Sequence, residues 1–512
     1  MNGAHALLHT LVGSGVTVCF ANPGTSEMHF VAAVDDVPEM RTILGLFEGV
    51  ATGAADGYAR MTDRPAATLL HLGPGMANGI ANLHNARRAN VPLVNIVGDH
   101  ATYHKQYDAP LEFDIDAAAS TFSGWVDRPV RAEDVGNSAA AAVAAACGPP
   151  AVVATLILPA DVSWDEGAVP GPPLGAPAAS GVDDLAVANA AKVLDSGERC
   201  LLLLGGRALR RASLGHARRI ADATGAGLLS ETFPSRVERG AGRPEIDRLL
   251  YDIDAARAQL AGYRQVILVE AQTPVSFFAY PGMSSELVSP DCQVHVLTSH
   301  GQDSASALAE LADRTATERH PRLRALARPP LPTGRLSKAA AADVVGALLP
   351  EGAIVVDEAG TAGGLAPAAT AGAPPHDWLK ITGGAIGWGL PAAVGAAVAV
   401  PDRKVVALQA DGSAMYTIQS LWTAARERLD ITVVIFNNRS YGILRGELAR
   451  LGVPSGQQAH DMLDLSRPDI NFVSLAEGLG VQAERATTAE QFIGALRRGL
   501  DDPGPRLIDA VL

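Results

Sequence analysis

Two hydrophobic runs in the last third of the sequence are each followed directly by polar residues that could bind a cation. Residues 404–410 (KVVALQA) lead into Asp411, and residues 431–436 (ITVVIF) lead into Asn437 and Asn438. If the two runs are neighbouring parallel strands, a carboxylate and an amide oxygen converge at one edge of the sheet. Mg²⁺ prefers oxygen ligands and often completes its shell with phosphate and water. The pattern therefore predicts a magnesium site.

Small residues beside these ligands could bind the phosphates of a cofactor. Gly412, Tyr441 and Gly442 would leave backbone amides open to an anion, and Ser413 follows in the same turn. The alternative is a pair of polar turns that end two strands, because Asp-Gly and Asn-Asn are ordinary turn residues. On these residues alone, the ordinary turns are the simpler interpretation.

A single acid begins a predicted helix of small residues in the first third of the chain. Residues 46–60 (LFEGVATGAADGYAR) place Glu48 at the first turn of this helix. A carboxyl group that is removed from water holds its proton more firmly, which suits a group that must exchange a proton near neutral pH. The alternative is an acid that only interacts with the dipole at the start of a helix.

Isolated polar residues follow the predicted strands of the same part of the chain. Ser26 lies in a turn (NPGTSE), His71 ends an apolar run, and His100 and His104 follow the run 91–98. A lone serine in a turn or a lone histidine on a strand is more often structural than catalytic. Further along, the small-residue loop 382–391 (TGGAIGWGLP) contains one bulky aliphatic residue, Ile386, and could equally be ordinary packing at a helix start.

The elements that must position these residues indicate an α/β fold in three domains, each an open, mostly parallel sheet flanked by helices. Short apolar runs alternate with helical windows such as 390–400, and ligand sites of such sheets lie at the carboxyl ends of the strands. Two stretches rich in Gly, Pro and Ala, 164–181 and 320–334, are predicted linkers. We therefore expect domains at 1–163, 182–319 and 335–512. The predicted strands are 15–21, 66–72, 91–98, 200–204, 265–270, 293–297, 353–356, 404–410 and 431–437.

The composition limits the partners and the cellular compartment. The chain has 512 residues, with 41 Lys and Arg against 55 Asp and Glu, so its formal charge is −14. This charge repels nucleic acid and anionic membranes. The start of the sequence lacks the features of a signal peptide, and no apolar run is long enough to span a bilayer. We expect a cytoplasmic protein without a disulfide framework or zinc site, because its four cysteines are far apart. These are Cys19, Cys147, Cys200 and Cys292.

The spacing of these motifs resembles the thiamine diphosphate-dependent enzyme superfamily. Asp411 and Asn438 are 27 positions apart, as in its cofactor motif, and residues 48–60 are similar to its E-x-x-A-x-x-x-A-[DE]-G-Y-A-R pattern. The resemblance implies that Asp411, the Asn438 side chain and the Ser440 carbonyl bind Mg²⁺. It also implies that Glu48 contacts the aminopyrimidine ring of the cofactor. One departure is Ala410, which stands where the family usually has glycine and is harmless only if its φ is negative. Cofactor contacts are expected from Gly384, Ile386, Gly412, Ser413, Tyr441, Gly442 and Ile443.

Within the superfamily, residues 22–27, His71 and residues 414–425 resemble benzoylformate decarboxylase. The resemblance implies that Ser26 binds the carboxylate of a 2-oxo acid and that His71 relays protons. Segment 276–280 (SFFAY) has no histidine where that enzyme carries a second catalytic one, so His100 or His104 is a candidate substitute. Ile443 replaces a smaller residue and narrows the pocket, which favours an aliphatic substrate over a bulky aryl one.

Other interpretations stay open at this point. Acetolactate synthase resembles the chain in the same two parts and often binds FAD, but the flavin-associated segment is not found after residues 265–270, so FAD is not expected. A non-catalytic paralogue is a further alternative, although the retention of Glu48, Asp411 and Asn438 argues against it. A nicotinamide-dependent enzyme lacks its glycine fingerprint here. The resemblance places the cofactor between two subunits, so at least a homodimer and commonly a homotetramer is expected. Glu447, one helical turn after Ile443, is predicted to face solvent rather than the pocket.

Overall fold

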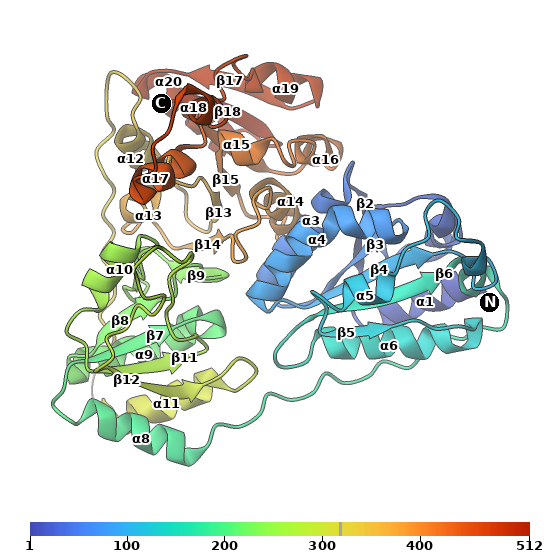
Figure 1. Ribbon diagram of the computed structural model, residues 1–512, viewed down its shortest axis with the longest axis horizontal. Helices are drawn as coiled ribbons and strands as arrows, with labels where there is room; N and C mark the ends of the chain where they lie inside the picture. Colours follow the sequence, from blue (N-terminus) through green and yellow to red (C-terminus); the bar gives the residue numbers. More distant parts are fainter. Residues whose placement is uncertain (317–319) are drawn as a thin grey trace.

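The computed structural model describes residues 1–316 and 320–512, whose strands form three separate sheets (Figure 1). Every strand pair in these residues is parallel except that of β9 with β14. Helices flank each sheet, so the α/β fold class predicted from the sequence is confirmed. The second domain was expected to end at residue 319, which lies outside the described residues. The domain boundaries stay a prediction.

The first sheet is built from the amino-terminal third of the chain. Its strands are fully buried near the centre because apolar residues face helices on both sides of a parallel sheet. The strand order is β2 (Arg41–Leu44), β1 (Val18–Asn22), β3 (Ala66–Leu70), β4 (Leu93–Asp99), β6 (Val153–Pro159) and β5 (Trp125–Asp127). Its helices are α1 (Gly3–Gly13), α2 (Met28–Ala33), α3 (Glu48–Thr62), α4 (Leu72–Ala89), α5 (Ile115–Ala119), α6 (Val135–Ala146) and α7 (Ala160–Trp164).

The middle sheet follows a long connection without a helix or strand, which agrees with the linker predicted at 164–181 except that Trp164 still belongs to α7. This connection crosses the lower face of the molecule in Figure 1. The strand order is β10 (Asp247–Arg248), β8 (Gly227–Ser230), β7 (Cys200–Leu204), β11 (Gln265–Val269) and β12 (Gln293–Thr298). The flanking helices are α8 (Asp184–Leu194), α9 (Arg211–Thr224), α10 (Ile253–Leu260) and α11 (Ser304–Thr315).

The third sheet contains one strand from the middle of the sequence. β9 pairs antiparallel with β14, so this edge of the third sheet is supplied by residues that precede the second linker. The strand order is β17 (Gln482–Ala486), β18 (Arg506–Val511), β16 (Ile431–Asn437), β15 (Val405–Ala410), β13 (Ile354–Glu358), β14 (His376–Lys380) and β9 (Arg236–Arg239). The helices are α12 (Lys338–Leu348), α13 (Ala366–Ala369), α14 (Gly389–Ala399), α15 (Asp411–Ala414), α16 (Ser420–Arg426), α17 (Gly442–Leu451), α18 (Gln457–Asp461), α19 (Phe472–Gly478) and α20 (Ala489–Asp501).

Helices α3 and α14 join the first sheet to the third. Both are rich in small residues, and their backbones approach so closely that a Cβ atom at Gly395 would lie 1.8 Å from the Ala54 carbonyl oxygen. A Cβ atom at Gly57 would similarly lie 2.1 Å from the carbonyl oxygen of Ala392. The absence of side chains at these positions lets the two helices bury a common apolar core.

A buried ion pair fixes this joint in one arrangement. Arg60 on α3 binds Asp56 one turn earlier, with Nε and Oδ1 2.8 Å apart, and both side chains are almost fully buried. The guanidinium also lies over the ring of Trp388, 4.4 Å from its centroid, and the Trp388 indole donates to Asp56. Removal of either charge would leave the other charge buried and unpaired. Because both charged groups also contact Trp388, the ion pair fixes how α3 lies against the start of α14.

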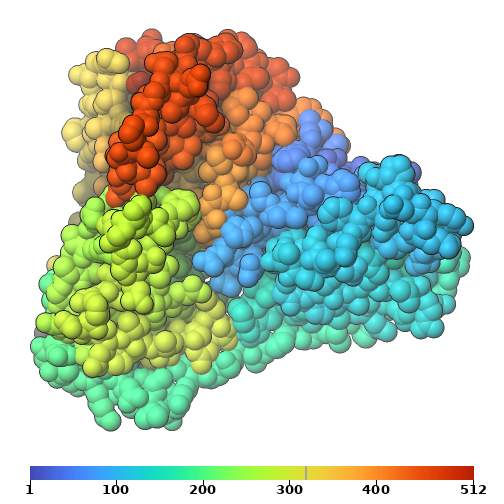
Figure 2. Space-filling model, in the orientation of Figure 1, coloured from blue at the N-terminus to red at the C-terminus, as the bar shows by residue number. Residues whose placement is uncertain are grey.

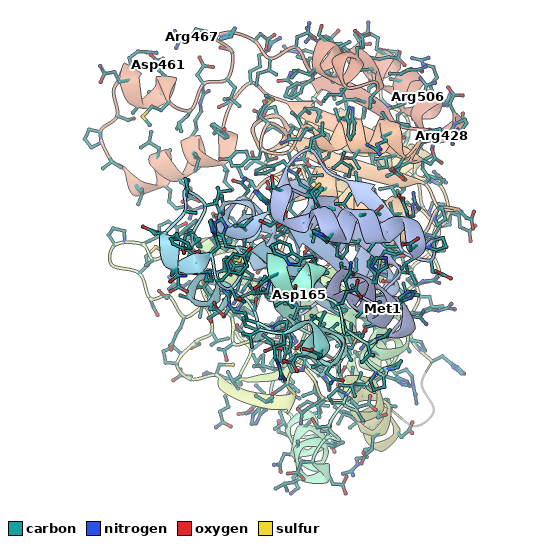
Figure 3. All side chains as sticks on the ribbon, turned by 90° about the vertical axis from the view of Figure 1, so that its right-hand side faces the viewer. Met1, Asp165, Arg428, Asp461, Arg467 and Arg506 are labelled. Carbon is teal, nitrogen blue, oxygen red and sulfur yellow. The ribbon has the colours of Figure 1, made fainter. Side chains whose placement is uncertain are left out.

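The three parts meet around a common centre, with the third sheet at the top of Figure 2 and the first and middle parts below it. The amino terminus lies beside the segment that follows α7, and Met1 and Asp165 are on the same side of the molecule in Figure 3. The Met1 carbonyl accepts the Ala168 amide at 3.0 Å. Within the described residues, no helix combines the length and the apolar character needed to cross a bilayer.

Candidate active site

Asp411 lies at the carboxyl end of β15, beside the carboxyl end of β16. The register pairs Ala410 with Phe436, so the residues that follow both strands share one edge of the sheet. Asp411 is 2% exposed and accepts the Gly412 amide at 2.8 Å and the Arg439 amide at 2.6 Å. Burial nevertheless raises the pKa of the Asp411 carboxyl, because desolvation outweighs these amides. A divalent cation bound to this carboxylate would stabilise its charged form and so oppose the effect of burial.

Asn438 and Ser440 lie in the same turn as the amides that bind Asp411. The Ser440 amide donates to the Asn438 Oδ1 atom at 3.0 Å, and the Gly442 amide donates to the Ser440 carbonyl at 2.8 Å. Each of these oxygens keeps a second lone pair for a ligand. Arg439 between them has a φ of 58°, an unusual value for a residue with a side chain. Two of the predicted metal ligands therefore lie in one strained turn, and the third, Asp411, contacts this turn through the Arg439 amide.

The glycines beside this turn let neighbouring side chains pack closely against the backbone. A Cβ atom at Gly412 would lie 2.4 Å from the Tyr441 ring, and one at Gly442 would lie 3.1 Å from the Asn438 amide nitrogen. Ser413 is buried and its hydroxyl lies 2.7 Å from the Gln409 amide. Ala410 has a φ of −82°, so alanine in place of the family glycine causes no strain. The oxygen donors fit Mg²⁺, whereas the amides of Gly412 and Gly442 donate to Asp411 and to the Ser440 carbonyl within the chain.

Glu48 begins α3 and is 8% exposed, so it is a buried acid rather than a surface cap. The Asn78 side chain donates to Glu48 Oε2 at 3.0 Å. The other oxygen faces Gly75, where a Cβ atom would lie 2.9 Å from Oε1 and 3.3 Å from the Cβ atom of His71. Glu48 and His71 thus border the same glycine at the start of α4.

His71 is paired with an acid that the sequence analysis did not single out. Its Nδ1 atom lies 2.8 Å from Glu27 Oε2, which also accepts the Gly24 amide at 2.7 Å. Glu27 is 1% exposed, and burial raises its pKa. Its Oε1 atom has no hydrogen-bond partner among the described residues. The signal for this pair was present in the segment NPGTSE, where the acid directly follows Ser26.

Ser26, His100 and His104 lie at the same edge of the first sheet. Ser26 is partly exposed in the turn Thr25–Glu27, next to the acid that binds His71. The rings of His100 and His104 follow β4 and have centroids 5.2 Å apart. The His100 Nε2 atom is buried without a partner in the described residues. The edge also contains Leu72, a buried residue with a φ of 48° that marks backbone strain beside His71.

The loop 382–389 is ordered by a second buried acid that the sequence analysis missed. Glu358, at the end of β13, accepts the amides of Gly387 at 2.8 Å, Trp388 at 3.2 Å and Gly389 at 2.7 Å. Burial raises the pKa of Glu358 to about 7. Gly384 has a φ of 73° and Ile386 is 37% exposed, so the loop presents an aliphatic side chain outwards. An acid at the end of a predicted strand was the signal available in the sequence.

Helix α17 carries Ile443 and Glu447 away from the sheet towards the middle part of the chain. Ile443 is 40% exposed. Glu447 was predicted to face solvent, but its carboxylate accepts the Tyr280 hydroxyl at 2.9 Å and its side chain is only 21% exposed. The prediction for Glu447 is therefore wrong. Tyr280 lies in the segment without a histidine, so this segment reaches the site through an aromatic hydroxyl.

Comparison with known proteins assigns both ends of the chain to one family. The thiamine pyrophosphate enzyme N-terminal TPP binding domain matches residues 1–120, and the C-terminal TPP binding domain matches residues 358–510. A benzoylformate decarboxylase of Pseudomonas aeruginosa is 32% identical over 97% of this chain and 96% of its own. The chain belongs to the thiamine diphosphate-dependent enzymes. Glu48 lies in the matched amino-terminal region, and Asp411 and Asn438 lie in the carboxy-terminal one.

Two further relatives place the chain in the benzoylformate decarboxylase and acetolactate synthase group. IlvX of Mycobacterium tuberculosis, whose name assigns it provisionally to the acetolactate synthase large subunits, is 60% identical over 100% of this chain and 99% of its own. The structure of a 4-hydroxybenzoylformate decarboxylase from Rhodococcus jostii has a TM-score of 0.87 and 27% identity, covering 100% of this chain and 99% of that one. The predicted superfamily and enzyme class are thus confirmed.

The predicted site residues form two groups within one chain. The first group surrounds Glu48 and His71 at the edge of the first sheet, and the second surrounds Asp411 and Asn438 at the edge of the third. Among the described residues, no hydrogen bond joins the two carboxylates of Glu48 and Asp411. Each group holds only one half of the predicted cofactor environment.

Proposed function

We propose that this protein is a thiamine diphosphate- and Mg²⁺-dependent 2-oxo acid decarboxylase or carboligase that acts on a small aliphatic substrate. The observation that carries the proposal is the approach of the buried Asp411 carboxylate to the turn that holds Asn438 and Ser440, where it accepts the Arg439 amide at 2.6 Å. This turn stands in a chain that has both cofactor-binding domains of the family. The donor set suits Mg²⁺, which commonly binds protein oxygens together with the phosphates of a ligand.

The residues of the third sheet would hold the cofactor through its metal and its phosphates. Asp411 would supply a charged ligand, and the Asn438 and Ser440 oxygens would supply neutral ones. Gly412, Ser413, Tyr441 and Gly442 would line the diphosphate, while Gly384, Ile386 and Ile443 would contact the rings. The thiazolium ring of the bound cofactor supplies the carbon nucleophile and accepts the electrons that decarboxylation leaves behind.

Glu48 would hold and move a proton at the aminopyrimidine ring. The Asn78 side-chain amide binds Oε2 and leaves Oε1 as the oxygen that faces Gly75. With Oε2 bound by Asn78, Oε1 would be the oxygen of Glu48 that holds the proton toward the aminopyrimidine ring. The macrodipole alternative does not account for an acid that is bound by a side-chain amide inside the fold.

Ser26 and His71 would act on the substrate. The Glu27 carboxylate binds the His71 Nδ1 atom and so fixes the ring orientation, which leaves Nε2 as the atom that can give or take a proton. Ser26, directly before Glu27, would donate its hydroxyl to the substrate carboxylate. The unpartnered Nε2 of His100 makes it the better candidate than His104 for the additional proton donor.

Ile443 supports an aliphatic substrate, because a branched side chain at this partly exposed position narrows the space left for an aryl group. An acetolactate synthase-like carboligation is the second candidate, favoured by the 60% identity to IlvX. Purified protein with thiamine diphosphate and Mg²⁺ should release CO₂ from pyruvate or a longer aliphatic 2-oxo acid. An aldehyde product identifies the decarboxylase, and a 2-hydroxy-2-alkyl-3-oxo acid identifies the carboligase. Absence of CO₂ with every such acid, including benzoylformate, would favour the non-catalytic paralogue.

The middle sheet supports the expectation that FAD is not bound. The glycine turn after β7, where a dinucleotide phosphate would lie, is filled by protein carboxylates. Glu270 accepts the Arg207 amide at 2.8 Å, and a Cβ atom at Gly206 would lie 2.4 Å from its Oε2 atom. Glu231 lies 3.4 Å from the Gly206 amide. Purified protein should therefore show no flavin absorbance.

A homodimer would bring the two halves of the site together. Exposed apolar side chains surround the Asp411 turn, and a second exposed set surrounds Glu48 and His71, so each could cover the other in a two-fold pair. The first set is Ile386, Met415, Tyr416, Ile443 and Leu444. The second set is Leu46, Tyr103, Tyr107, Leu111 and Phe113. A homotetramer made of two such dimers is the expected larger assembly.

A further inference from the structure

A cavity of about 320 Å³ lies between the middle and third sheets, away from the predicted site residues. Two edge strands form its walls, β10 of the middle sheet and β9 of the third, together with the segment 364–371 that follows β13. Val237, Ile246 and Leu250 make part of the wall apolar. The volume falls within the usual range for pockets that bind small molecules.

Four cationic side chains line this cavity, namely Arg239, Arg248, Arg324 and Lys380. Two of them are neutralised, since Arg324 pairs with Glu245 and Lys380 binds Asp357 at 2.8 Å. Arg239 and Arg248 form no ion pair with any described residue, and their printed hydrogen bonds run to the carbonyl oxygens of Pro367 and Thr232. The cavity therefore contains two positive charges that the protein does not balance by direct contact.

Burial disfavours these positive charges and lowers the pKa values of both arginines. Burial lowers the pKa of Arg239 to about 10, and the neighbouring Arg324 and Arg248 guanidinium groups lower it further. Burial also lowers the pKa of Arg248. Asp247 and Asp357 offset only part of this repulsion. An anion between the two guanidinium groups would relieve it, because a planar guanidinium binds carboxylate or phosphate oxygens in pairs.

We propose that this cavity binds a small organic anion with two negative charges, a phosphate monoester or a dicarboxylate. Arg239 and Arg248 would bind its oxygens from the two sheets. Arg239 lies over the Trp378 ring, 5.0 Å from the centroid, which holds the guanidinium in place. The lining has four cationic side chains against the three carboxylates of Glu245, Asp247 and Asp357, so it is positive overall and an anion is the ligand that it favours.

The floor of the cavity is connected to the candidate cofactor loop through a single strand. Asp357 faces the cavity and binds Lys380 and the Trp378 indole. The next residue, Glu358, points to the other side of β13 and holds the amides of the loop 387–389. Thr361, just before the wall segment, lies near Gly442, where a Cβ atom would be 3.2 Å from its hydroxyl. An occupant would therefore contact elements that lead directly to the cofactor loops.

This connection makes the cavity an effector site, a conclusion that rests on the proposed function. Binding of the anion and binding of thiamine diphosphate should then change each other's affinity by the same factor. For two coupled binding sites, one ligand typically changes the affinity for the other by about fivefold or more.

The site is tested with the full-length protein saturated with thiamine diphosphate and Mg²⁺, so that the diphosphate position is already filled. Inorganic phosphate and malonate are titrated separately, with calorimetry and tryptophan fluorescence as readouts, because Trp378 lines the cavity. We expect saturable binding of at least one probe, and its identity distinguishes a phosphate ester from a dicarboxylate. Arg239→Gln and Arg248→Gln should each weaken binding at least about tenfold.

Two further variants make this result decisive. Arg264→Gln removes an exposed arginine of the middle sheet that does not line the cavity, and it should bind the probes like the wild type. If Arg239→Gln fails to fold, Arg248→Lys tests the same point, since lysine keeps the charge but not the paired donors. Absence of saturable binding, or equal binding by the arginine variants, would overturn the site.

The coupling is measured in a separate titration of metal-loaded protein with thiamine diphosphate, with and without the probe that binds. An affinity that changes in the wild type but not in Arg248→Gln supports the connection through β13. An unchanged affinity would overturn the coupling. Failure of thiamine diphosphate to bind at all would instead contradict the proposed function, so the two failures are distinguishable.

Discussion

At the scale of single residues, the buried acids of the site are held mainly by backbone amides. Asp411 accepts two amides, Glu358 accepts three, and Glu27 accepts that of Gly24 as well as His71. Amides of this kind fix a carboxylate without competing cationic side chains, which leaves its charge available to a metal or a proton. Residue types alone do not reveal such contacts, and for this reason the sequence pointed to Asp411 and Glu48 but not to Glu27 or Glu358.

Asp411→Asn should abolish most of the metal-dependent affinity for thiamine diphosphate. The variant loses the charged ligand and turns an NH₂ group or a weaker acceptor towards the Gly412 and Arg439 amides. Loss of a charged hydrogen-bonding group costs about 1.5–3 kcal/mol, which corresponds to roughly tenfold to hundredfold weaker binding. Calorimetric titration in the presence of Mg²⁺ measures this. Asp430→Asn, a partly exposed acid paired with Lys404, is the matched control and should bind normally.

The raised pKa of Glu358 should make the stability of the cofactor-free protein depend on pH. Its pKa is raised from 4.5 to about 7 in the folded state, so the folded protein binds more protons than the unfolded one between these values. The free energy of unfolding should therefore fall as pH rises from about 4.5 to 7, by an amount on the order of 1–3 kcal/mol for this group. Denaturant curves of wild type and Glu358→Gln at several pH values isolate the contribution. A difference between the two proteins that does not vary with pH would contradict it.

At the scale of elements, the apolar runs were sufficient to locate the strands that carry the site. The runs 404–410 and 431–437 became β15 and β16 within one residue, because a fully buried parallel strand is apolar throughout. The adjacency of β15 and β16, on which the metal prediction depended, follows from their short crossover. β9 was not predicted, since its residues Arg-Val-Glu-Arg alternate and their antiparallel pairing with β14 depends on contacts distant in sequence.

The close packing of α3 on α14 makes a specific prediction about stability. Gly395→Ala places a methyl group where the Ala54 carbonyl oxygen lies 1.8 Å away, so the helices must separate. We expect a loss of about 1–3 kcal/mol in the free energy of unfolding. Gly215→Ala in α9 is the matched control, because nothing lies within 4 Å of its Cβ position. It should stabilise the protein by roughly 0.5–1 kcal/mol through helix propensity. Equal effects of the two changes in denaturant unfolding would refute this account of the joint.

At the scale of the whole molecule, one chain presents two half-sites and two exposed apolar sets. The sequence motifs predicted both half-sites, but nothing local in them shows how the halves are brought together. The position of the middle part was also not predictable, since it depends on the contact of α17 with Tyr280 and on the shared edge strand β9. The domain boundaries at 1–163, 182–319 and 335–512 stay predictions at this scale.

Leu444→Asp should convert the proposed dimer into monomers. Leu444 is 46% exposed beside Ile443, and a charge there would be buried without a partner in the dimer. Sedimentation velocity should show half the mass, and activity should be lost with it because the two half-sites of one chain would no longer meet those of a partner. Leu185→Asp, at a 60% exposed position on α8, is the control and should remain dimeric and active. A Leu444→Asp monomer with full activity would show that the site is complete within one chain.

The central claim is that the buried Glu48 moves a proton at thiamine diphosphate bound to the Asp411 turn. Exchange of the C2 proton of the bound cofactor for deuterium, followed by NMR after acid quench, measures this directly. The wild type should accelerate exchange, and Glu48→Gln should bind the cofactor but exchange about 10²–10⁴ times more slowly. Exchange by Glu48→Gln at the wild-type rate, with the cofactor bound, would contradict the account.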